Sequence, residues 1–204
     1  MKKFLFAGIC LLGLGACASV PVQKNCAETK IMPSLFAEGK TLAAFYMQAS
    51  RKQYGLDGVL EIKKLGVNEY EINAFSAAGG YRLLQAIVTP DKTQYQFLIK
   101  QADKAVVRAK LQRMWTLLLF QPESMSRCQR KEMKTYISYQ APFARKYIYE
   151  DKNSYPEQVL SSALFNRTTL FFKHYQTVAQ EQVPDVLEYQ DGAITVQLQL
   201  IRLK

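Results

Sequence analysis

Apolar and polar residues alternate through most of the chain after Thr41, and one segment with a helical period interrupts them. Alternation with a period of two is typical of half-buried β-strands, and residues 67–75 and 193–203 show it most clearly. Residues 55–58 (Gly-Leu-Asp-Gly) are a turn signal, and a glycine pair at 79–80 lies in another connection. Connections this short favour antiparallel hairpins, so the sequence predicts a large antiparallel sheet.

We expect one domain over residues 41–204, because no internal repeat, low-complexity run or linker divides that part of the chain. An aromatic content of 12% also favours strands. A short helix is expected within residues 153–165, which have Pro156 near their start. The predicted strands are 59–65, 67–75, 81–89, 93–100 (with Tyr95, Phe97 and Ile99 on one face), 134–139, 143–150, 168–177, 186–189 and 193–203.

Residues 103–120 are expected to form the principal helix, with Asp103 as its N-cap and Pro122 just after its end. Its second half is strongly apolar. The fold class is therefore α+β and mostly β, an antiparallel sheet with one long helix.

One face of this helix carries Val107, Leu111, Met114, Trp115 and Leu118, at the spacing of successive turns. These side chains could line a cavity for an apolar ligand, or they could be ordinary core residues. Both interpretations remain open, because both require the same spacing.

Residues 1–16 are expected to be a signal peptide, because two lysines precede an apolar run that is too short to span a bilayer. Residues 14–17 (Leu-Gly-Ala-Cys) follow and resemble the lipobox of bacterial lipoproteins. The resemblance implies cleavage before Cys17 and attachment of a diacylglycerol to its thiol. An ordinary signal peptide that happens to precede a cysteine is the alternative.

Residues 17–40 are expected to be the lipidated N-terminus and a tether. Ala18 follows the anchor cysteine, and by analogy with enterobacterial lipoproteins the lack of Asp there implies the outer membrane of a Gram-negative bacterium. No later run reaches about 18 apolar residues, so we expect a water-soluble body that faces the periplasm.

Cys26 and Cys128 are the cysteines that remain beyond the signal peptide and the lipid anchor. The periplasm is oxidising, so we expect them to form a disulfide that ties the tether to the body. Two unrelated thiols are the alternative.

No group of residues suggests a catalytic centre, so we do not expect an enzyme, a metal site or a cofactor. His174 is the sole histidine, and nothing near it in sequence supplies a nucleophile and an orienting partner. A structural histidine on a strand is the expectation.

The formal net charge is +10, but a periplasmic location makes nucleic acid an unexpected partner. Anionic headgroups or an acidic periplasmic carrier protein are plausible partners for the basic residues, and solubility is the alternative explanation. The basic residues in question are Arg51, Lys52, Lys63, Lys64, Arg127, Arg130, Lys131 and Lys134.

The order of lipobox, strands, one helix and further strands resembles that of proteins with the LolA/LolB fold. Residues 169–175 (Thr-Leu-Phe-Phe-Lys-His-Tyr), 183–189 (Val-Pro-Asp-Val-Leu-Glu-Tyr) and 194–203 resemble the LolB ending. Residues 72–75 (Ile-Asn-Ala-Phe) resemble the LolB segment with a protruding apolar loop residue, whose counterpart would be Phe75. A buried strand end is the alternative for Phe75. The chain is also similar to LolB-like lipoproteins found with polyene-lipid biosynthesis genes.

The resemblance implies that the sheet is strongly curved and forms an open or half barrel. The principal helix and short helices would cover it as a lid, and acyl chains would bind between them. Two functions follow. In the first, an outer-membrane-anchored periplasmic lipoprotein binds acyl chains of a lipid or lipoprotein cargo and helps to deliver it to the outer membrane. In the second, the chain is an anchored structural or assembly lipoprotein whose barrel is filled by its own side chains.

Overall fold

The computed structural model describes residues 35–36, 39–52, 54–121, 125–139, 145–150, 155–163, 166–178 and 180–204. The predicted signal peptide, Cys17 and most of the predicted tether lie outside these residues, and the described part contains a single α-helix. Its elements are β1 (Leu42–Arg51), β2 (Tyr54–Gly66), β3 (Glu69–Ser76), β4 (Arg82–Val88), β5 (Thr93–Leu98), α1 (Ala105–Leu119), β6 (Met125–Lys131), β7 (Lys134–Tyr139), β8 (Arg145–Glu150), β9 (Gln158–Ala163), β10 (Asn166–Val178), β11 (Glu181–Asp191) and β12 (Ile194–Leu203).

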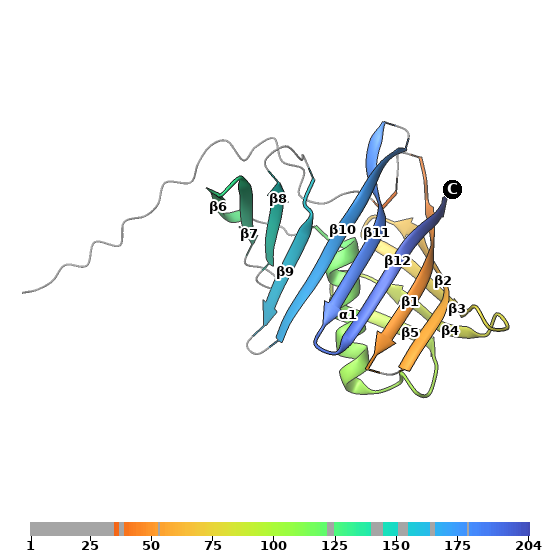
Figure 1. Ribbon diagram of the computed structural model, residues 1–204. Helices are drawn as coiled ribbons and strands as arrows, with labels where there is room; N and C mark the ends of the chain where they lie inside the picture. The colour runs from red at the N-terminus through yellow and green to blue at the C-terminus, as the bar shows by residue number, and fades with distance from the viewer. Residues whose placement is uncertain are drawn as a thin grey trace, which may run out of the picture.

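All the strands belong to one 12-stranded antiparallel sheet with the order β5-β4-β3-β2-β1-β12-β11-β10-β9-β8-β7-β6 (Figure 1). The chain runs from β1 outward to the edge strand β5 and crosses as α1 to the opposite edge, β6. It then returns strand by strand to β12, which pairs with β1. Since β5 and β6 do not pair, the described sheet is open, as the resemblance to the LolA/LolB fold implied.

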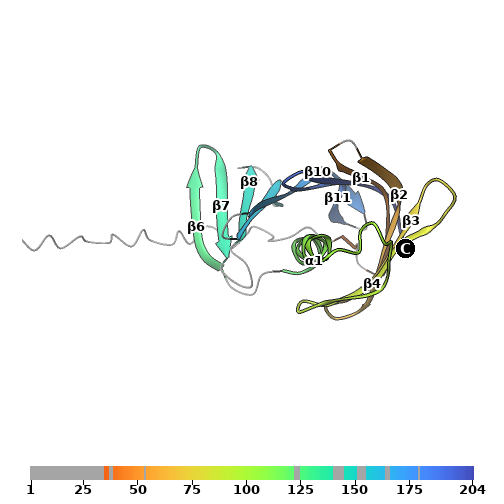
Figure 2. The same cartoon turned by 90° about the horizontal axis from the view of Figure 1, so that it is seen from below.

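The sheet curves around α1, which lies on its concave side (Figure 2). Register shifts interrupt the pairing of β1 with β12, β2 with β3, β3 with β4 and β4 with β5. A β-bulge bends a strand and increases its local twist. These irregularities therefore explain why the β1–β5 part of the sheet curls over one side of the helix.

The core of the protein forms between α1 and the concave face. The second half of α1, residues 114–119, is buried, which confirms the apolar character predicted for it. Leu60 and Ile62 of β2 and Ile72 of β3 belong to the same buried cluster. They occupy alternate positions on their strands, so the period of two correctly predicted the inward face there.

The end of the segment predicted as a tether contributes to this core. Leu35 is buried, and the ring of Phe36 stacks on Tyr70 with centroids 6.0 Å apart. Tyr70 also meets Phe120 edge to face, immediately after α1. Residues 35–36 therefore pack beside the C-terminal end of the helix.

Residues 55–58 lie inside β2, so the turn predicted there is wrong. Arg51 of β1 pairs with Tyr54 of β2, so the chain has already reversed before Gly55. Gly58 has a different role, because a Cβ at this position would lie 2.1 Å from the carbonyl oxygen of Phe75 on β3. In the sequence, a glycine required by close strand approach looks the same as a turn glycine.

The helix predicted within residues 153–165 is also wrong, since residues 158–163 form β9. This strand pairs with both β8 and β10. Val159 and Ser161 are buried on its inner face, but six residues give too short an alternation to outweigh the helical interpretation suggested by Pro156. Strand β6 was not predicted at all, because its sequence, MSRCQRK, lacks apolar alternation.

Two finer predictions also fail. Phe97 was expected to share a face with Tyr95, but a bulge in the β4–β5 pairing puts it on the outer face, and it is 42% exposed. Asp103 was expected to cap α1, but the helix begins at Ala105 after Lys104 and has no side-chain cap. The carboxylate of Asp103 instead accepts a 2.6 Å hydrogen bond from Arg108.

Replacing Gly58 by alanine should destabilise the protein, because the added methyl group meets the backbone of β3. We expect the free energy of unfolding to fall by about 1–3 kcal/mol, the usual cost of overpacking. Gly55→Ala is the matched control, since nothing lies within 4 Å of a Cβ at that position of the same strand. Chemical denaturation of both variants measures the difference. Equal stability of the two variants would contradict the close approach of β2 and β3.

Candidate functional site

A cavity of about 180 Å³ lies between the first half of α1 and the concave face of the sheet, and its lining is almost entirely apolar. Its walls come from α1, from β1–β5, from β11 and β12, and from the segment between β5 and α1. The lining residues are Met47, Ala49, Leu56, Leu60, Ala74, Leu83, Leu84, Leu98, Ile99, Ala102, Val107, Lys110, Leu111, Met114, Trp115, Tyr189, Ile194 and Val196.

Small side chains leave this space open. Ala49 on β1, Ala74 on β3 and Ala102 before α1 lie in the wall, where larger residues would reach towards the helix. An apolar cavity that cannot offer hydrogen bonds to water tends to stay dry and to accept apolar ligands. The described structure thus contains the space on which a binding function depends.

Four of the five residues predicted on the helix face line the cavity: Val107, Leu111, Met114 and Trp115. Leu118 does not line it and is fully buried in the core one turn beyond. The helix therefore supports both interpretations of its apolar face, with the cavity along residues 107–115 and solid packing beyond Trp115.

Phe75 does not line the cavity. It lies near the end of β3, where it is half-buried, and the guanidinium of Arg82 lies 5.9 Å from the centre of its ring. The neighbouring connection, residues 77–80, is exposed. A contact of Phe75 with a membrane is a prediction that these positions do not test.

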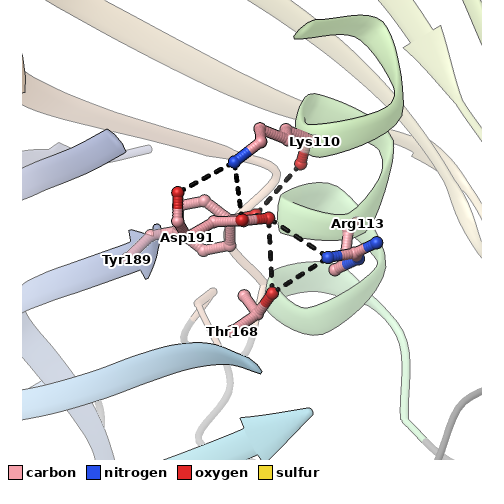
Figure 3. A network of polar contacts seen from close by, with 5 residues as sticks. All are labelled: Lys110, Arg113, Thr168, Tyr189 and Asp191. Atoms are coloured by element: carbon pink, nitrogen blue, oxygen red, sulfur yellow. Dashed lines mark hydrogen bonds and ion pairs between the residues drawn. The ribbon is translucent and has the colours of Figure 1, made fainter. Parts of the chain in front are cut away.

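A buried carboxylate, Asp191, connects α1 to the sheet beside the cavity (Figure 3). Asp191 is the last residue of β11 and is only 2% exposed. Its Oδ1 lies 2.7 Å from Nζ of Lys110, and its Oδ2 lies 3.2 Å from Nη1 of Arg113. Both cations come from α1, so this cluster links the helix to the hairpin between β11 and β12.

Two hydroxyl groups complete the cluster around Asp191. Thr168 of β10 donates to Oδ2 of Asp191 over 3.3 Å, and Tyr189 of β11 donates to the same oxygen over 3.1 Å. Lys110 also donates to the backbone carbonyl of Asp191 over 2.9 Å. Desolvation raises the pKa of Asp191, but the hydrogen bond and charge of Lys110, together with Tyr189 and Arg113, outweigh it, so the pKa lies below its usual value.

This cluster was not predicted from the sequence. Asp191 precedes Gly192 and was predicted only as part of a turn, although the turn itself comes at residues 192–193. Lys110 and Arg113 are three positions apart, so they project from neighbouring parts of the helix surface. That spacing was the available signal, but long cations on a helix usually face solvent.

The other side of α1 contacts the edge strand β5. The guanidinium of Arg108 lies 5.2 Å from the ring centre of Tyr95, and Thr93 hydrogen-bonds to Gln112. Burial raises the pKa of Tyr95 to about 12, despite the opposing charge of Arg108. The helix is thus held by polar contacts to both β5 and β11.

α1 has little stability of its own. Its N-cap residue makes no side-chain hydrogen bond, its first turn has no acidic residue and its last turn has no basic one. Isolated helices of this length are marginal in water, and most helix stability in proteins comes from packing. The helical state of residues 105–119 therefore depends on contacts with the sheet.

The remaining predicted sites lie away from the cavity or outside the described residues. Cys128 is buried on β6 and is disulfide-bonded, while Cys26 lies outside the described residues, so their pairing stays a prediction. His174 is exposed on β10 and has a positive φ of 53°. Arg127 and Lys131 are exposed on the edge strand β6. In the part of the chain that is described, no helix is both long and apolar enough to cross a membrane.

An open, curved antiparallel sheet with one helix across its concave face is the LolA-like fold, which the sequence predicted. The chain is similar to the crystal structure of a LolA superfamily protein from Nitrosomonas europaea, with a TM-score of 0.57 and 9% identity over 88% of this chain and 90% of that one. No protein-family model matches the chain, and no curated protein matches it.

Two further structures show more distant similarity. One is an outer membrane lipoprotein-sorting protein domain from Vibrio parahaemolyticus, with a TM-score of 0.47 and 10% identity over 81% of this chain and 85% of that one. The other is a DUF1329 family protein from Desulfovibrio piger, with a TM-score of 0.44 and 6% identity over 82% and 86%. At such identities the likeness concerns the fold alone.

Replacing Asp191 by asparagine should weaken the attachment of α1. We expect the free energy of unfolding at pH 7 to fall by about 1–3 kcal/mol, because a hydrogen-bonded buried charge is lost while Lys110 and Arg113 keep some access to water. Because the pKa of Asp191 is lower in the folded protein than in the unfolded chain, its ionised form stabilises the folded state at pH values above the unfolded-state pKa. The difference in stability between the unmodified protein and the variant should therefore shrink as the pH falls below about 4.

Glu188→Gln is the control for the Asp191 variant. Glu188 lies on the same strand and pairs with Lys173 near the surface, where an ion pair contributes about 0–1 kcal/mol. Denaturation at several pH values measures both variants. If the Asp191 variant loses no more free energy of unfolding than the Glu188 variant, the cluster around Asp191 does not hold the helix.

Proposed function

We propose that the chain is a lipoprotein of the bacterial outer membrane that holds an acyl chain of a lipid or lipoprotein cargo between α1 and the sheet. The observation that carries the proposal is the apolar cavity under a helix that depends on its contacts. Each buried methylene contributes about 0.8 kcal/mol, so an acyl chain binds without polar contacts. No covalent step is part of this function.

The size of the cavity bears on how a ligand enters. A volume of about 180 Å³ is close to the roughly 150 Å³ of an engineered apolar cavity that binds benzene. It is smaller than the roughly 300–1,000 Å³ of usual ligand pockets. A whole acyl chain therefore requires α1 to move away from the sheet, and the helix acts as a lid.

The contacts of α1 suit such a movement. Polar contacts hold the first half of the helix over the cavity, and they can exchange with water as it opens. The second half is packed among buried residues and can stay in place as the fixed end. Binding then shifts an equilibrium between closed and open forms, which allows uptake and release without an energy source.

Anchoring rests on Cys17 and places the body on the periplasmic side of the outer membrane. The thiol would carry the lipid, and more than one acyl chain makes membrane attachment effectively permanent. A soluble periplasmic carrier is the partner from which an anchored receptor would accept its cargo. The alternative, an anchored structural protein without a ligand, is less favoured because the space beneath α1 is not filled.

The binding proposal is tested with the full-length lipoprotein, purified in a non-ionic detergent. We expect mass spectrometry of an organic extract to show about one acyl-chain species per protein. Added dodecanoate should change the emission of Trp115, which is the sole tryptophan and lines the cavity. Ala49→Phe should reduce binding at least about tenfold, because it fills the cavity and removes burial of two or more methylenes.

Ala105→Phe is the matched control, since Ala105 is exposed at the start of α1 and does not line the cavity. It should bind dodecanoate as the unmodified protein does. A blank extract together with unchanged Trp115 emission would refute the carrier and favour the structural protein. If Ala49→Phe and Ala105→Phe bind dodecanoate equally well, the ligand lies outside this cavity.

The location is tested by replacing Cys17 with serine. We expect the unmodified protein to fractionate with the outer membrane and to incorporate radiolabelled palmitate. The Cys17→Ser variant should lose the label and leave the outer-membrane fraction, whereas Cys26→Ser should keep both properties. Labelling that persists in the Cys17 variant would refute the lipobox assignment.

A further inference from the structure

The wall of the cavity in the described structure includes three side chains with polar groups, Lys110, Trp115 and Tyr189. Two of them are engaged with the carboxylate of Asp191 (Figure 3). Nζ of Lys110 donates to both Oδ1 and the backbone carbonyl of Asp191, and the hydroxyl of Tyr189 lies 3.1 Å from Oδ2. That hydroxyl also lies 3.2 Å from the backbone carbonyl of Lys110. Lys110 and Tyr189 therefore act between α1 and β11.

Trp115 is the polar member of the wall that has no such partner. Its side chain is 1% exposed, and its indole Nε1 is buried without a hydrogen bond among the described residues. The backbone nearby is already used, because carbonyls inside α1 accept bonds within the helix and those of paired strands accept bonds within the sheet. A buried tryptophan usually finds a partner for its N–H, so this donor calls for an explanation.

A trapped water molecule does not suit this position. A buried water needs two to four polar partners, and the other polar side chains of the wall are bonded to Asp191. The free space next to the indole is the apolar cavity itself, of about 180 Å³. Because Trp115 forms part of the wall of so small a cavity, a ligand that fills it lies against the indole. The acceptor that fits here is thus an oxygen atom of an otherwise apolar ligand.

We propose that the indole N–H of Trp115 donates a hydrogen bond to a carbonyl oxygen of the ligand and determines the specificity of the cavity. This inference rests on the proposed function, because it names the class of ligand for the same site. An acyl group has a carbonyl at the start of its chain, both in an ester and in an amide. Trp115 therefore distinguishes an acyl chain from a hydrocarbon chain of the same length.

The discrimination comes from the donor that the wrong ligand leaves unpaired. A hydrocarbon in the cavity keeps the N–H of Trp115 away from any acceptor, whereas a carbonyl oxygen satisfies it. A site with a buried donor rejects the analogue that lacks the acceptor for this reason. The net contribution of one hydrogen bond corresponds to about fivefold in affinity.

The test uses two small probes, acetophenone and isopropylbenzene, in which a methyl group stands in place of the carbonyl oxygen. Benzene binds an engineered apolar cavity of roughly 150 Å³, so compact aromatic probes suit a cavity of about 180 Å³. Calorimetric titration of the full-length protein, at one detergent concentration, gives both dissociation constants. The preference for acetophenone over isopropylbenzene should be at least about fivefold smaller in Trp115→Phe than in the unmodified protein.

Comparing this preference between variants removes two side effects. Each probe enters detergent micelles to the same extent with every variant, and the space left by the smaller phenylalanine ring is open to both probes. Tyr147→Phe is the control, since it removes a buried hydroxyl that does not line the cavity. Its preference should equal that of the unmodified protein.

A second measurement needs no variant and so holds even if Trp115→Phe does not fold. Trp115 is the sole tryptophan, so a proton–nitrogen correlation spectrum contains one indole signal. Acetophenone should move the proton resonance of this signal downfield, as a hydrogen bond does. Isopropylbenzene carries the same ring without the oxygen and should produce no such shift.

The outcomes separate this inference from the proposed function. If both probes bind but Trp115→Phe keeps the preference of the unmodified protein, the carbonyl site is refuted while binding in the cavity stands. An indole signal that responds equally to both probes has the same meaning. If neither probe binds, the cavity takes no ligand and both proposals fail.

Discussion

The packing of α1 into the concave side of the sheet is the constraint on which the rest of the structure depends. The helix is the sole crossing between the two edge strands of the described sheet, and it lacks the caps that would stabilise it alone. Its second half is buried as densely as a core helix, whereas its first half spans an apolar cavity and is held by polar contacts. In the proposed function, this one element combines a fixed end with an end that can be displaced.

The curvature of the sheet and the small residues in its wall explain why space remains beneath the helix. Bulges among β1–β5 bend this half around α1, and Ala49 and Ala74 keep the two surfaces apart. The Asp191 cluster lies beside this space and ties α1 to β11. Beyond it, the concave side is again largely apolar, with Val159 and Leu170 in the buried core.

The sequence predicted the sheet and the principal helix with its apolar face, because long alternations and helical spacing reflect one buried face. It failed where contacts with another strand determine the structure. The backbone of β3 requires a glycine at position 58, and pairing with β8 and β10 makes residues 158–163 a strand. A bulge in the β4–β5 pairing places Phe97 on the outer face. Asp191 and Arg145 are far apart in sequence, and only the registers of three successive strand pairings bring them into one row across the sheet.

Hydrogen–deuterium exchange of the full-length protein, with and without dodecanoate, tests most directly whether α1 is a displaceable cover over a binding cavity. The account predicts that amides in the first half of α1 exchange faster than those of the central strands β1 and β12 in the ligand-free protein. Bound dodecanoate should alter exchange in this half of the helix and leave β1 and β12 unaffected. Protection of α1 equal to that of the central strands, with no change on adding the ligand, would contradict it.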